Sequence, residues 1–68
     1  MKIQKVCRDF LRMQKGRELD AIQAARLMKE VWGISVDHHE MSYALDQLRN
    51  SKEASITRPG GFAVYIIE

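Results

Sequence analysis

Apolar residues near the start of the chain recur at the spacing of an amphipathic helix. One face of this segment carries Ile3, Val6, Cys7, Phe10 and Gln14, with Leu11 and Met13 widening the stripe. Gly16 follows at the position where a helix C-cap is expected. The pattern predicts a helix over residues 2–15.

A second apolar series predicts a helix over residues 20–32. Asp20 stands three residues before Gln23, which is the spacing of a capping box, and Gly33 ends the segment. Trp32 is expected to pack against the following helix or the C-terminal strands. The apolar positions are Ala21, Ala24, Ala25, Leu27, Met28, Val31 and Trp32.

The stretch GISVDHHE interrupts the helical pattern, and a third helix begins after it. Asp37 with Glu40 three residues later predicts the restart by the same capping logic. We expect this helix to end near Asn50 or Ser51. Its inward positions are Met41, Ala44, Leu45 and Leu48.

The last part of the chain has the pattern of a β-hairpin. ASIT and FAVYII are β-prone runs, and RPGG between them predicts a glycine-containing loop. The three helices and the hairpin together predict an α+β fold in which the hairpin closes the core. FAVYII is apolar on both faces, so either Ala63, Tyr65 and Ile67 or Phe62, Val64 and Ile66 must be partly exposed. This favours a homodimer through the C-terminal strand.

Length and composition are those of one small globular domain spanning residues 1–68. The chain has 68 residues, of which 46% are hydrophobic and 29% charged. Its single cysteine, Cys7, cannot form an internal disulfide, which favours a reducing cytoplasm and a core role for the thiol. We expect no signal peptide, because the first residues, MKIQKVCRDF, carry charge at every second or third position and lack an apolar run. We expect no membrane-spanning segment, because the chain has no run of 18 apolar residues.

Catalytic and metal-binding motifs are absent from the sequence. It contains no phosphate-binding glycine loop, nucleophile elbow or paired catalytic carboxylates. His38 and His39 are adjacent, so they are expected to point in different directions, and Cys7 alone does not complete a zinc site with them. Asp37 is interpreted as a helix cap. The sequence therefore predicts a protein that is not an enzyme and needs no metal or cofactor.

Four segments resemble a winged helix-turn-helix domain, and together they extend over most of the chain. AARLMKEVWGIS resembles the second helix and turn of that family, and MSYALDQL resembles its recognition helix. SITRPGGFAVYII is similar to the strand, wing and strand that follow, and ELD to the small first strand. The turn ISVDHH is longer than the family's compact turn, and Lys52 and Glu53 stand where a glycine is often found. The layout is similar to small stand-alone bacterial or phage regulators.

The resemblance implies binding to double-stranded DNA, with the third helix in the major groove. The helical wheel places His39, Tyr43, Asp46 and Asn50 at the centre of the outward face. Glu40 and Asp46 would repel phosphates unless each accepts from a cytosine amine. The face therefore has two interpretations: it reads bases, or its acidic groups meet solvent or a protein partner. The residues expected to read bases are His39, Ser42, Tyr43, Gln47 and Asn50.

Basic residues supply candidate backbone contacts. Arg58 beside Pro59 could enter a minor groove, with Gly60 allowing close approach of the backbone, or RPGG is simply a tight turn with a solvated arginine. Residues 1–17 hold six basic residues and one acid, so they form either a phosphate-contacting or an ordinary solvated face. The candidates for phosphate contacts are Lys5, Arg8, Arg12, Lys15, Arg17, Arg26 and Lys29.

These observations predict a small winged helix-turn-helix transcriptional regulator. The alternative is a winged-helix module that binds another regulator or enzyme through the acidic third helix and the apolar strand.

Overall fold

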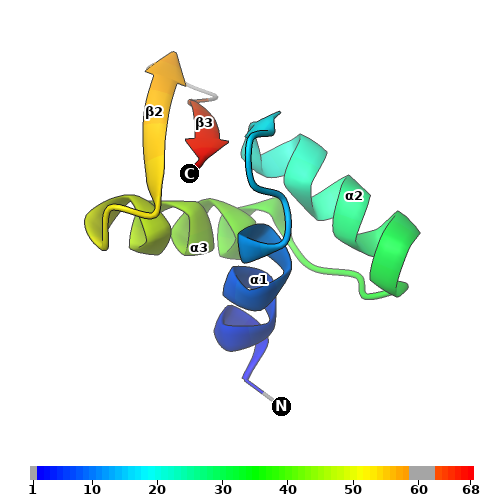
Figure 1. Cartoon of the computed structure of the whole chain (residues 1–68). Coiled ribbons are helices and arrows are strands. Elements are labelled where there is room, and N and C mark those ends of the chain that lie inside the picture. Colours follow the sequence, from blue (N-terminus) through cyan, green and yellow to red (C-terminus); the bar gives the residue numbers. More distant parts are fainter. Residues whose placement is uncertain (1, 59–62) are drawn as a thin grey trace.

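Three helices and three short strands make up the part of the chain that the computed structural model describes, residues 2–58 and 63–68. Helix α3 lies across the middle of the molecule, with α1 in front of it, α2 beside it and the strands β2 and β3 above it (Figure 1). The predicted α+β class is confirmed, and the order of elements is compatible with a winged helix. The elements are α1 (Ile3–Arg12), β1 (Glu18–Leu19), α2 (Ala21–Trp32), α3 (His38–Asn50), β2 (Ala54–Arg58) and β3 (Val64–Ile67).

Helix α2 begins and ends where its sequence predicts. The Asp20 carboxylate accepts a hydrogen bond from the Gln23 backbone N–H at 2.7 Å, and the Gln23 side chain accepts from the Asp20 backbone N–H at 3.3 Å. This is the expected capping box. Gly33 closes the helix at a φ of 69°, in the left-handed region that glycine adopts without steric penalty.

Helix α1 is shorter than the predicted residues 2–15. It ends at Arg12, because the chain then turns to meet the sheet. The Gly16 backbone N–H donates to the Ile67 carbonyl at 2.7 Å, and the Ile67 N–H donates to the Arg17 carbonyl at 3.1 Å. Met13, expected on the apolar stripe, lies in this turn with 69% of its surface exposed.

The three strands form an antiparallel sheet in the order β1-β3-β2. Tyr65 and Ile67 face the helices and are almost completely buried. In the other predicted set, Val64 is also buried and Ile66 is half-buried. Phe62 lies outside the described residues. Because β3 is paired on both edges, it has no free edge for a second copy. The homodimer predicted from the partly exposed apolar face of the C-terminal strand would therefore use the outer face of β3, and it stays a prediction.

The core lies between the helices and the inner face of the sheet. Leu19, Ala54, Tyr65 and Ile67 join the helical residues there, so the hairpin closes the core as expected. Cys7 is fully buried, and burial raises the pKa of its thiol. The largest fully buried side chains are Phe10, Leu11, Met28, Met41, Leu45, Leu48, Ile67 and Cys7.

The end of α2 differs from the predicted pattern. Val31 was expected in the core but is 59% exposed. Trp32, expected on the third helix or the strands, packs edge-on against Phe10 of α1, with the ring centroids 5.1 Å apart. Four-residue spacing along α2 could not reveal this, because the position of α1 decides which side of the last turn is covered.

Lys52 adopts the backbone conformation of a glycine just after α3. Its φ is 64°, the only positive φ at a non-glycine residue in the described part of the chain. This is the region of chain where the resembling family often has glycine. The left-handed conformation brings the Cβ of an L-residue close to a carbonyl oxygen.

We expect Lys52→Gly to stabilise the protein by about 0.5 to 1 kcal/mol, because it relieves the strain at positive φ while losing part of that gain to chain entropy in the unfolded state. Urea denaturation measures the change. Lys52→Ala is the matched control and should be nearly neutral, since it keeps the Cβ. A destabilised glycine variant would contradict the assignment of strain to Lys52.

Candidate nucleic-acid interface

One face of α3 is exposed along the whole helix. The helix buries Met41, Ala44, Leu45 and Leu48 completely, as predicted. On the opposite side, four side chains follow one another at helical spacing and are all exposed. We call them the exposed stripe of α3: His39, Tyr43, Asp46 and Asn50. Ser42 and Gln47 flank this stripe and are half-buried.

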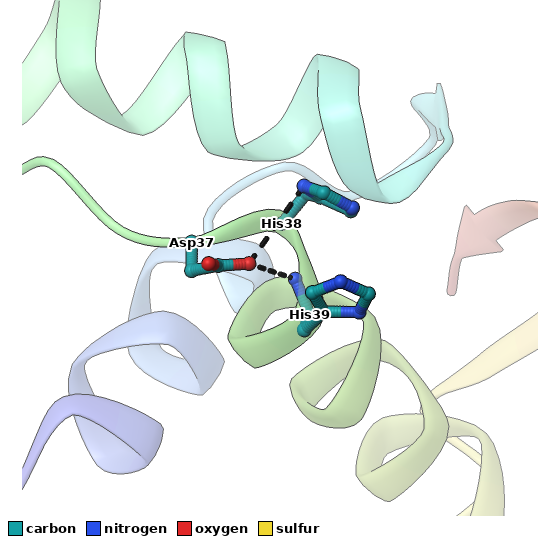
Figure 2. Close-up of side chains that lie close together, drawn as sticks. All are labelled: Asp37, His38 and His39. Carbon is teal, nitrogen blue, oxygen red and sulfur yellow. Dashed lines mark hydrogen bonds and ion pairs between the residues drawn. The ribbon is translucent and has the colours of Figure 1, made fainter.

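The start of α3 holds Asp37, His38 and His39 close together (Figure 2). The Asp37 carboxylate accepts from the His39 backbone N–H at 2.8 Å, which confirms its role as the cap and lowers its pKa. The two imidazole rings have their centroids 4.2 Å apart, so the expectation that they point in different directions is wrong. Helical side chains tilt towards the N-terminus of the helix. In the first turn of α3 no preceding helical turn separates the rings of His38 and His39.

The same three residues could offer ligands to a metal ion. Their ligand atoms lie within 4.8 Å of one another, and all three side chains are exposed. One Asp37 oxygen already accepts from the backbone, and the positive end of the helix disfavours a cation. The geometry is therefore accounted for by helix capping, and we assign no metal to it.

Both acidic groups of the predicted reading face are held by neighbouring elements. Glu40 was expected to complete a capping box with Asp37, but its side chain instead accepts from the Gln4 amide of α1. Gln4 also donates to the Glu40 carbonyl at 3.0 Å. At the centre of the stripe, the Tyr65 hydroxyl of β3 donates to the Asp46 carboxylate. Burial, together with this hydrogen bond, raises the pKa of Tyr65 to about 12, so the hydroxyl remains a donor at neutral pH.

Two of the basic residues expected to contact phosphates are engaged within the protein. Arg12 makes a two-point contact with Glu53, with nitrogen-to-oxygen distances of 2.8 and 3.2 Å. Lys5 lies 2.9 Å from Asp9, which also faces Arg12 at 3.4 Å. The Arg12 guanidinium, with help from the Ser51 hydroxyl, lowers the pKa of Glu53 to about 2. The Arg12–Glu53 pair ties α1 to the segment after α3, and the ion pairs of Arg12 and Lys5 together reduce the free positive charge of α1.

Arg58 stands at the exposed end of β2, opposite Val64 of β3. It lines a polar recess of about 430 Å³ with Glu18 and Asp20 among the other lining residues. Gly60, the other predicted wing contact, lies outside the described residues.

Two of the remaining basic residues share their surroundings with acidic residues. Arg17 and Arg26 lie around a shallow recess that also contains Glu18 and Glu30. Lys15 and Lys29 are exposed, and Arg8 is half-buried. The acidic groups beside Arg17 and Arg26 lower the positive potential that these two residues offer to a phosphate backbone.

Sequence reasoning missed Gln4, Glu53 and Tyr65 as partners of the charged groups. Their contacts span 36, 41 and 19 residues along the chain. The alternation of apolar residues in the last strand allowed Tyr65 to face inward, but no local signal identified Asp46 as its acceptor.

Comparison with protein-family models, with curated proteins and with solved structures finds no match to this chain. The geometry of the exposed stripe and the order of the elements are therefore the features of the molecule that bear on its function. Among the described residues, no helix combines the length and the apolar character needed to cross a membrane.

Replacing Glu53 by Gln tests the Arg12–Glu53 contact through pH. The folded pKa of Glu53 is lowered from 4.5 to about 2, so the ionised carboxylate stabilises the fold above pH 4.5. The wild-type protein should be the more stable one there, and its advantage should disappear as the pH falls through about 2. Urea denaturation over this pH series measures the difference. The control is Glu30→Gln on the exposed side of α2, and an advantage of wild type over Glu53→Gln that does not change with pH would contradict the pairing.

Proposed function

We propose that this protein is a winged helix-turn-helix DNA-binding protein acting as a small transcriptional regulator. In this proposal α3 enters the major groove and its exposed stripe faces the base edges. The end of β2 brings Arg58 to the backbone or the adjacent minor groove. The protein acts by occupying DNA rather than by catalysis.

The observation that carries the proposal is that α3 is fully packed on one face and exposed along the opposite face, the exposed stripe. His39, Tyr43 and Asn50 point away from a core that α3 fills with its opposite face. A helix fully packed on one side and polar on the other can insert into a major groove without disturbing the fold. Glu40 is drawn towards α1 by Gln4, which moves one acidic side chain on the flank of α3 away from this surface.

The arrangement of the sheet also supports the proposal. The small strand β1 adds to the hairpin on the far side of β3 from β2, as in the resembling family. Lys52 takes a positive φ in the segment where that family often has glycine. Both features are independent of the composition of the stripe.

The chemistry of the stripe suits base reading better than tight non-specific binding. Asn50 can pair with adenine, and His39 can donate to guanine or to phosphate. Gln47 and Ser42 on the flank add polar groups, and Tyr43 offers a large exposed surface. Because Lys5 and Arg12 are paired with acids, phosphate contacts are expected mainly from Arg58, Arg26 and Lys29.

A protein-interaction module is the second candidate. Tyr43 is 57% exposed on the stripe, and exposed aromatic residues are enriched at protein interfaces. In that case the same face of α3 would bind a partner protein and DNA would not bind.

A titration of duplex DNA at several salt concentrations tests the proposal. Affinity should fall steeply with salt, and Arg58→Ala should weaken binding and reduce the slope of log K against log salt by about 1. Lys5→Ala removes the same charge from α1 and is the matched control, expected to change little.

No binding at low salt would overturn the DNA-binding function and favour the protein-interaction module. Equal losses for Arg58→Ala and Lys5→Ala would show that overall charge, and not the wing, governs the affinity.

A further inference from the structure

Asp46 is the one member of the exposed stripe that is hydrogen-bonded to the sheet. It lies between Tyr43 and Asn50 on α3, and its Oδ1 accepts from the Tyr65 hydroxyl. Tyr65 is only 5% exposed, and its position in β3 is paired with Leu19 on one side and Ile56 on the other. The Tyr65 hydroxyl is therefore positioned by the sheet, and it restrains the Asp46 carboxylate at the centre of the exposed stripe.

Only one oxygen of Asp46 is used in this way. Among the described residues, Asp46 Oδ2 has no hydrogen-bond donor, while the side chain as a whole is exposed. A carboxylate in a major groove is repelled by the phosphates and loses hydration unless a base amine replaces the water. In the proposed complex, Asp46 thus either lowers the affinity for DNA or accepts a hydrogen bond from a specific base.

We propose that Asp46 Oδ2 accepts a hydrogen bond from the N4 amine of a cytosine, and that Tyr65 is the positioning residue that holds it for this contact. The inference rests on the proposed DNA-binding function and adds to it a requirement for a particular base. It assigns to the middle of α3 a preference for a base pair that presents cytosine on the strand facing Asp46.

The choice of cytosine follows from the single oxygen that remains. In the major groove, cytosine presents an amine donor, whereas adenine presents its amine beside the N7 acceptor. A carboxylate oxygen next to N7 meets a second lone pair, which disfavours adenine. Guanine and thymine present acceptors at the same edge and repel the carboxylate.

Glu40 provides an internal comparison. Its side chain accepts from Gln4 and lies on the flank of α3 nearest to α1. It carries the same charge as Asp46 and also lies on α3, but its partner draws it away from the exposed stripe. Removing its charge should therefore change the overall affinity slightly and leave the base preference unchanged.

The first experiment selects binding sites from random duplexes with the wild-type protein and then measures affinities for single base-pair changes. We expect one position at which cytosine is required, where replacing the C·G pair by T·A weakens binding roughly tenfold. Asp46→Asn should lose this preference or change it to adenine, which Asn pairs with. Glu40→Gln should keep it.

Tyr65→Phe tests the positioning role. It removes the hydroxyl while retaining the buried ring, so binding driven by phosphates should persist and its salt dependence should be unchanged. Discrimination between C·G and T·A at the selected position should fall severalfold. Circular dichroism of each variant checks that the fold is retained.

A second measurement leaves the protein unaltered. Replacing the selected cytosine by 2-pyrimidinone removes only the 4-amino group, and it should weaken wild-type binding about as much as the T·A change. The same replacement should have little effect on Asp46→Asn, because the two changes remove the same contact.

The outcomes separate this inference from the proposed function. Duplex binding without a cytosine requirement, or a requirement that survives in Asp46→Asn, would overturn the role of Asp46 and leave DNA binding standing. Unchanged discrimination in Tyr65→Phe would overturn the positioning role. Absence of any duplex binding at low salt would overturn both.

Discussion

The burial of one face of α3 is the constraint on which the rest of this structure depends. Met41, Ala44, Leu45 and Leu48 are completely removed from solvent, and α3 contacts α1, α2 and β2. Each fully buried side chain of the size of leucine or methionine contributes about 1.5 to 3 kcal/mol. Rotating α3 would expose these four residues, so the packing determines which side chains remain outward. The exposed stripe is a consequence of the core and not an independent feature.

Polar contacts between distant parts of the chain then determine which charged groups on the surface are available to a ligand. Tyr65 holds Asp46, Gln4 holds Glu40, and Arg12 holds Glu53. In each case a partner from another element determines whether a charged group is available. A count of charged residues on a helical wheel overstates the free positive charge of α1, and it does not show that both acids of α3 are hydrogen-bonded to other elements.

The sheet takes part both in the packing of the core and in the polar contacts of the surface. β3 pairs with β1 and β2 at its edges, and its inner face supplies Tyr65 to the core and to Asp46. The strand that completes the core thus also touches the exposed stripe. This explains how so short a chain can present a rigid polar surface: the same strand stabilises the fold and orients a side chain on α3. The Asp37, His38 and His39 cluster, by contrast, belongs to the exposed helix start and is explained by local capping alone.

The sequence by itself determined the elements whose signals are local. Asp20, Gln23 and Gly33 bounded α2, the spacing of Met41, Ala44, Leu45 and Leu48 identified the buried face of α3, and the turn residues indicated a hairpin. Only the tertiary structure decided the early end of α1, the burial of Tyr65 and the exposure of Val31. It also decided which partners hold the two acids of α3. The reason is physical: a cap or a helical period acts within one or two turns, whereas pairing of Gly16 with Ile67 or of Asp46 with Tyr65 requires elements that meet only after folding.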